Sequence, residues 1–371
     1  MALFEHTVLF FPTSYAEIAH RIDKIDPIKY GESRNFISGA VTYLSPYISR
    51  GVISTKQVLE SVLKKGYQVK NIEKFIQELA WRDYWQQIWI EKGEGINSDL
   101  KNQQLHVAHH EIPTALVDAE TGIEAIDKAV TEFYRTGYLH NHVRMYVAAI
   151  ACNIGQSKWN YPAKWMYYHL LDGDWASNAL SWQWVAGVNS NKKYVANQDN
   201  INRYCHTHQK RTFLDVDYSE LSKMEIPKAL EESSVEILTT PLPAKSKLDL
   251  AKQLPTCLYN FYNLDPKWKQ EINANRILLL EPSVFEKYPI SQKSIDFMLG
   301  LSKNISGLQT YVGEFDELLH DYDIGDIFFK EHPLNTNYKG KEESRDWMFS
   351  VSGYHSSFFG FWKKCKKQLK Y

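Results

Sequence analysis

Residues 171–184 read LDGDWASNALSWQW. Asp174, Asn178 and Trp182 follow one another at intervals of four, so a helix would place all three on one face. Asp174 is well placed to cap the start of that helix, a role worth roughly 1 kcal/mol. A cap alone does not require the amide and the large aromatic residue on the same face, and this combination favours a pocket for a flat heteroaromatic ligand.

A possible partner for this segment lies upstream in HNHVRM, where His140 and Arg144 are four residues apart. A buried arginine needs a carboxylate, because an unpaired charge is expensive to remove from water. Asp172 is the obvious candidate. The spacing fits a ligand pocket and a structural ion pair between two helices equally well.

Composition limits the class of protein. The chain has 371 residues, with 43 basic and 44 acidic side chains and a formal net charge of −1. The molecule as a whole therefore has no electrostatic field that would attract nucleic acid. The four cysteines lie more than fifty residues apart, which favours reduced thiols over a disulfide framework or a metal site. No apolar run reaches the ~18 residues of a membrane span, and the opening lacks a signal peptide. We therefore expect a soluble cytoplasmic protein without a bound metal.

Helical periodicity dominates the first part of the chain, where eight of the eleven tryptophans fall between Trp81 and Trp184. Such aromatic content is typical of a large core, of a pocket for a flat ring, or of an electron path. A mostly helical domain is predicted over 1–214, with a polar connection at 92–120. Helices are expected at 52–65, 71–91, 121–137 and 138–155, and another beginning at Pro162.

The pattern changes further along. Residues 215–269 read as a linker or an ordered surface crossing, and short apolar runs beginning at 276, 308 and 326 predict strands, with a helix over 293–304. We expect a mainly α protein in which a small α/β domain, 270–371, follows the helical domain. Five lysines and no acid occupy 355–371, which a solvated helix end explains as well as any partner does.

The motifs together resemble the flavin-binding domain of DNA photolyases and cryptochromes over about residues 14–213. They are TYLSPYISRGVIS at 42–54, ELAWRDY at 78–84, TGIEAID at 121–127, TGYLHNHVRMYVA at 136–148 and DGDWASNALSWQW at 172–184. The resemblance implies a helical bundle that holds FAD. In it Asp172 would pair with Arg144 beside the flavin ring, Asp174 would bond the pyrimidine edge, and Asn178 would face N5. The implied cofactor-binding residues are Tyr30, Thr42, Leu44, Ser45, Asn141, Arg144, Asp172, Asp174 and Asn178.

The resemblance also implies an activity, the light-driven splitting of cyclobutane pyrimidine dimers in DNA by an electron from reduced FAD. Implied catalytic residues are Glu78, Asn178, Trp182 and Trp159, the two tryptophans as electron carriers. Residues implied to contact the lesion are Glu78, Trp81, Arg82, Asn141, Met145 and Trp184. Photolyases for the (6-4) photoproduct carry histidines at the positions of Asn141 and Met145, so the cyclobutane dimer is the expected lesion.

Departures from the family pattern qualify this interpretation. Tyr43 replaces an arginine and Tyr138 a tryptophan, and the third electron carrier would fall at His106. Usual members begin with an α/β antenna domain, whereas here the flavin segment starts almost at once, which implies a short form.

A basic surplus between residues 158 and 211 favours a DNA-facing side, with seven bases against three acids. We expect a monomer that binds damaged DNA; the alternative is a cryptochrome-like photoreceptor without repair activity.

Overall fold

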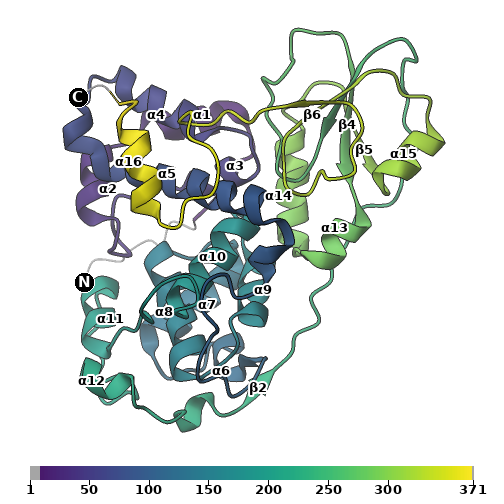
Figure 1. Cartoon of the computed structure of the whole chain (residues 1–371). Helices are drawn as coiled ribbons and strands as arrows, with labels where there is room; N and C mark the ends of the chain where they lie inside the picture. Colours follow the sequence, from purple (N-terminus) through teal and green to yellow (C-terminus); the bar gives the residue numbers. More distant parts are fainter. Residues whose placement is uncertain (1–8, 370–371) are drawn as a thin grey trace, which may run out of the picture.

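A computed structural model of the chain describes residues 9–369, so most of the opening used to exclude a signal peptide lies outside it. Its larger part is helical, as predicted, and a five-stranded parallel sheet lies beside it (Figure 1). No helix in residues 9–369 is long and apolar enough to cross a bilayer. The first helices are α1 (Tyr15–Asp23), α2 (Pro27–Ser33), α3 (Ser45–Ser49), α4 (Thr55–Lys64) and α5 (Val69–Lys92).

A second group of helices completes the helical part. Its members are α6 (Thr114–Val117), α7 (Glu124–Thr136), α8 (Asn141–Ala149), α9 (Asn160–His169), α10 (Trp175–Val185) and α11 (Gln198–Cys205). Of these, α10 packs against α5. Each helix expected from periodicity is present, although α9 begins two residues before Pro162. The polar connection at 92–120 holds the 3-10 turn η1 (Gly93–Asn97), strand β1 (Ile112–Pro113) and α6.

The sheet contains β3 (Thr256–Tyr259), β4 (Asn275–Leu280), β5 (Leu308–Val312), β6 (Ile327–Lys330) and β7 (Lys341–Glu343) in the order β5-β4-β3-β6-β7. All four pairings are parallel. The three predicted strands correspond to β4, β5 and β6. The central strand β3 lies within 215–269, so the sheet begins before residue 270 and this part of the segment is not a linker. Its four residues are all buried and show no alternation, which hides the strand from a periodicity search.

The two faces of the sheet belong to different cores. Alternate residues such as Leu278 and Leu280 join the main hydrophobic core, to which α14 (Gln292–Ser302) contributes, while Ile277 and Leu279 pack with α15 (Phe315–Asp321) in a second cluster. Helix α13 (Pro282–Lys287) follows β4 directly. The remaining short elements, α12 (Tyr218–Leu221), η3 (Lys228–Leu230) and β2 (Ser233–Ser234), lie on the connection from α11 to the sheet.

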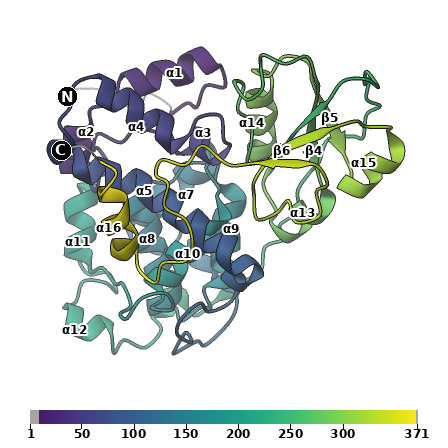
Figure 2. The same cartoon turned by 45° about the horizontal axis from the view of Figure 1, so that its top comes forward.

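After β7 the chain returns to the helical part. A strap, residues 344–357, leads from the sheet to the last helix, α16 (Phe358–Lys366), which lies along α5 in both views (Figures 1 and 2). Residues 344–369 therefore pack with the helical part, in contrast to the expected α/β domain over 270–371. We propose to place the domain boundary after β7 instead.

Candidate functional site

A cavity of about 570 Å³ opens between α5, the loop before α3, α8 and α10. Most of the residues predicted to form the site line this one cavity, although they come from segments more than a hundred residues apart. These residues are Tyr30, Thr42, Ser45, Glu78, Trp81, Arg82, Asn141, Arg144, Met145, Asp172, Asp174, Asn178, Trp182 and Trp184.

Asp172 and Arg144 form the ion pair that the sequence suggested. Nη2 of Arg144 lies 3.0 and 2.9 Å from the two carboxylate oxygens of Asp172, and its Nε donates to the backbone carbonyl of Leu139. Burial would raise the pKa of the Asp172 carboxyl, but Arg144 and Arg82 beside it outweigh burial and hold that pKa below its usual value. The carboxylate is therefore ionised and fixed in the cavity wall.

Asp174 has the capping role predicted for it. Its side chain accepts a hydrogen bond from the backbone N–H of Ala176 at the start of α10. Gln86 on α5 donates from Nε2 to Oδ1 of Asp174 over 2.5 Å, and Nη1 of Arg82 lies 3.6 Å from Oδ2. Two residues of α5 thus fix this carboxylate from outside its own helix.

The amide of Asn178 is oriented by the backbone. Its Nδ2 donates to the carbonyl oxygen of Ala163 over 2.7 Å. Because the amide nitrogen is engaged there, Oδ1 remains as the acceptor of this side chain in the cavity wall. This acceptor can receive a hydrogen bond from a ring N–H of a bound heteroaromatic group.

Glu78 is held by two cations in the wall formed by α5. Its Oε1 lies 3.2 Å from Nε of Arg34 and 3.0 Å from Nζ of Lys74. One turn further, Trp81 lines the same wall and stacks on Phe358 of α16, with ring centroids 3.8 Å apart and planes inclined by 10°. The α5 wall therefore presents a carboxylate, a cation and an aromatic ring to the cavity.

Two predicted residues lie apart from the cavity lining. The side chain of Leu44 is buried in the hydrophobic core. Trp159 is fully buried, and its Nε1 donates to Oδ1 of Asp99 over 2.8 Å. Trp182 lines the cavity and is buried, whereas Trp184 is 37% exposed.

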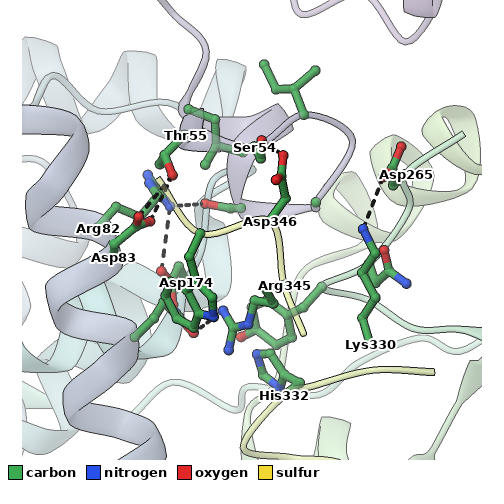
Figure 3. A pocket seen from close by; sticks show the side chains of 18 of the residues that line it. Ser54, Thr55, Arg82, Asp83, Asp174, Asp265, Lys330, His332, Arg345 and Asp346 are labelled. Carbon is green, nitrogen blue, oxygen red and sulfur yellow. Dashed lines mark hydrogen bonds and ion pairs between the residues drawn. The ribbon is translucent and has the colours of Figure 1, made fainter. Parts of the chain in front are cut away.

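A second, smaller cavity of about 120 Å³ lies where the carboxyl ends of β3, β6 and β7 face the helical part (Figure 3). Ile48, Arg82 and Asp174 line both cavities, so they form a shared wall. On its far side Nη1 of Arg345, in the strap, donates to Oε1 of Gln86 over 2.6 Å. A continuous chain of hydrogen bonds thus runs from the strap through Gln86 to Asp174.

Buried titratable groups surround this shared wall. Burial raises the pKa of Asp83 to about 6, although the Met348 N–H, Thr55 and Arg345 partly oppose it. Burial also lowers the pKa of His332 well below its ordinary value, so this imidazole is neutral. Within residues 9–369 no cluster of three or more His, Cys, Asp or Glu side chains could hold a metal ion.

Sequence reasoning missed Gln86 and Arg345. Gln86 could have been found, because it continues the four-residue spacing of Glu78 and Arg82 along α5. Arg345 is separated from Gln86 by 259 residues, and no local pattern predicts that contact.

The cavity residues fit FAD. A volume of about 570 Å³ lies in the range of cofactor pockets, roughly 300–1,000 Å³, and the cavity wall combines aromatic rings with many polar and charged side chains. The acceptor oxygen of Asn178 and the fixed carboxylate of Asp174 suit the hydrogen-bonding edge of a flavin ring, and Arg144 supplies a cation.

Comparison with known proteins agrees with this fit. The family described as "FAD binding domain of DNA photolyase" matches residues 75–239. A deoxyribodipyrimidine photo-lyase of Agrobacterium fabrum is 28% identical over 250 residues, 60% of this chain and 51% of that protein. Another, of Synechococcus, is 30% identical over 174 residues, 44% of this chain and 36% of that one. The chain thus matches about half or less of the length of these relatives.

Among solved structures, a Synechocystis cryptochrome aligns with a TM-score of 0.49 and 24% identity, over 53% of this chain and 44% of that one. The family match and the chemistry of the cavity agree on FAD as the cofactor. Residues 75–239 therefore form an FAD-binding domain similar to that of DNA photolyases.

Proposed function

We propose that this protein is a light-driven DNA repair enzyme that splits cyclobutane pyrimidine dimers. One observation carries the proposal: the residues suited to FAD and the set Glu78, Trp81 and Arg82 line the same cavity. The dimer would have to turn out of the DNA stack to reach this cavity, as enzymes that act on bases require. Bound FAD would absorb light and supply the electron.

The chain's own residues would bind and orient the lesion. Trp81 offers an aromatic surface against which the dimer can pack, and Met145 adds an apolar contact. Glu78 is positioned by Arg34 and Lys74 and would accept hydrogen bonds from the ring N–H groups of the dimer or, when protonated, donate one to its carbonyls. Asn141 and Met145 cannot act as proton donors, which supports the cyclobutane dimer over the (6-4) photoproduct.

A blue-light photoreceptor is the second candidate, and a specific observation favours it. Phe358 covers one face of Trp81, and two cations already engage Glu78. A receptor needs the flavin but no open lesion site. Removal of thymine dimers from irradiated oligonucleotide by the chemically reduced protein, in light but not in darkness, would support repair; no loss of dimers in either condition, with FAD bound, would support the receptor.

A further inference from the structure

The last helix of the structure, α16, has one apolar face and one basic face. Phe358, Phe361, Trp362 and Cys365 are buried, and all of them belong to the face that packs toward α5. The sequence of the helix contains no acidic residue. Because α16 begins beside the wall of the larger cavity, its basic face lies close to that cavity.

Both ends of α16 are anchored on α5. At its start Phe358 is 3% exposed and stacks on Trp81, which lines the larger cavity. Toward its end, Nζ of Lys366 lies 2.9 Å from Oε1 of Glu73, and Nε1 of Trp362 lies 3.3 Å from the same oxygen. The helix, which lies along α5 in Figure 2, therefore runs antiparallel to it, and its first turn contacts Trp81 in the cavity wall.

Lys363, Lys364 and Lys367 project from the other side of α16. All three are exposed, and none of their ammonium groups forms an ion pair or hydrogen bond with residues 9–369. By contrast, the basic surplus predicted for 158–211 is partly neutralised, because Lys158 pairs with Asp99 and Lys210 with Asp199. Unpaired cations on a helix without acids are available to an anionic partner.

We propose that the basic face of α16 binds the DNA backbone beside a lesion held in the cavity. At 1.5 Å per residue, Lys363 lies about 8 Å and Lys367 about 14 Å along the helix from Phe358. Each DNA strand carries one phosphate per about 3.4 Å of duplex axis, so with α16 lying along that axis these lysines would meet phosphates about two to four nucleotides from the extruded lesion. The proposal rests on the proposed repair function and names the surface that receives the duplex.

The test compares two triple variants that remove the same charge. The first variant carries Lys363→Gln, Lys364→Gln and Lys367→Gln. The matched control carries Lys247→Gln, Lys252→Gln and Lys303→Gln. These three control lysines are exposed, lie before β3 or directly after α14, and form no ion pair among the described residues. Binding of a duplex containing one thymine dimer is measured between 50 and 200 mM salt. FAD content and thermal unfolding, measured on both, establish that the folds are intact.

We expect the α16 variant to bind at least about tenfold more weakly at low salt, with its log–log salt slope reduced by about 0.9 for each phosphate that the protein no longer neutralises. The control should match the parent. Equal affinity and slope in all three proteins, or equal weakening in both variants, would overturn the role of α16. Failure of the parent itself to bind the damaged duplex would instead count against the repair function.

Discussion

Gln86 donates a hydrogen bond to Asp174 while accepting one from Arg345, so a residue of the strap is coupled to a carboxylate in the wall of the larger cavity. Asp174 lines both cavities, and Gln86 is buried. The segment that follows the sheet thereby helps to fix one wall of the larger cavity (Figure 3).

Replacing Gln86 should therefore weaken FAD binding. In Gln86→Leu the buried carboxylate loses a donor, and a hydrogen bond to a charged group contributes about 1.5–3 kcal/mol. We expect at least about tenfold weaker FAD binding in fluorescence titration of the apoprotein. Gln87→Leu is the matched control, because Gln87 is also buried but bonds the Gly353 N–H instead. Equal FAD affinity in both variants would contradict the coupling.

Asp172→Asn should destabilise the fold and release FAD. Arg144 would keep its charge while losing its partner, which costs roughly 3 kcal/mol or more. Adding Arg144→Met to this variant should recover part of the melting temperature, because the unpaired charge is then gone. A double variant no more stable than Asp172→Asn would show that the ion pair is not the source of the destabilisation.

Trp182→Phe should slow the photoreduction of oxidised FAD, since this buried tryptophan lines the cavity. Repair by chemically reduced protein should stay close to that of the parent, because photoreduction is bypassed. Trp268→Phe, in the sheet-bearing part, controls for the removal of an indole. Unchanged photoreduction in Trp182→Phe would mean that electrons enter by another path.

The lowered pKa of His140 predicts that the protein becomes less stable in acid. Burial, His142 and Arg144 lower its pKa to about 4, against about 6.5 in an unfolded chain. Below pH 6.5 the unfolded state binds the additional proton, so stability falls as the pH drops from about 6.5 to 4, by at most about 3 kcal/mol.

His140→Asn tests this, because an asparagine side chain can still accept the hydrogen bond from the His142 N–H that His140 Nδ1 accepts. The melting temperature of the variant should depend less steeply on pH in that range. Parallel curves for parent and variant would exclude His140 as a source of the acid sensitivity.

The helical part could be predicted from sequence because its signals are local. Periodicity, glycine stops and the Asp174 cap each lie within one helix, and the cavity residues carry recognisable motifs. Strand β3 could not be predicted, because four buried residues without alternation fit several structures. The stacking of Phe358 on Trp81 depends on the path of the strap, for which no spacing rule exists.

The most direct test of the proposed repair function uses two duplexes, one with a single cyclobutane thymine dimer and one with a single (6-4) photoproduct. The reduced protein and its Glu78→Ala variant are illuminated with near-UV or blue light, and the products are separated by chromatography. We predict restored thymines from the cyclobutane dimer only, with a lower yield in the variant. Repair of the (6-4) product with the cyclobutane dimer left intact would contradict this function.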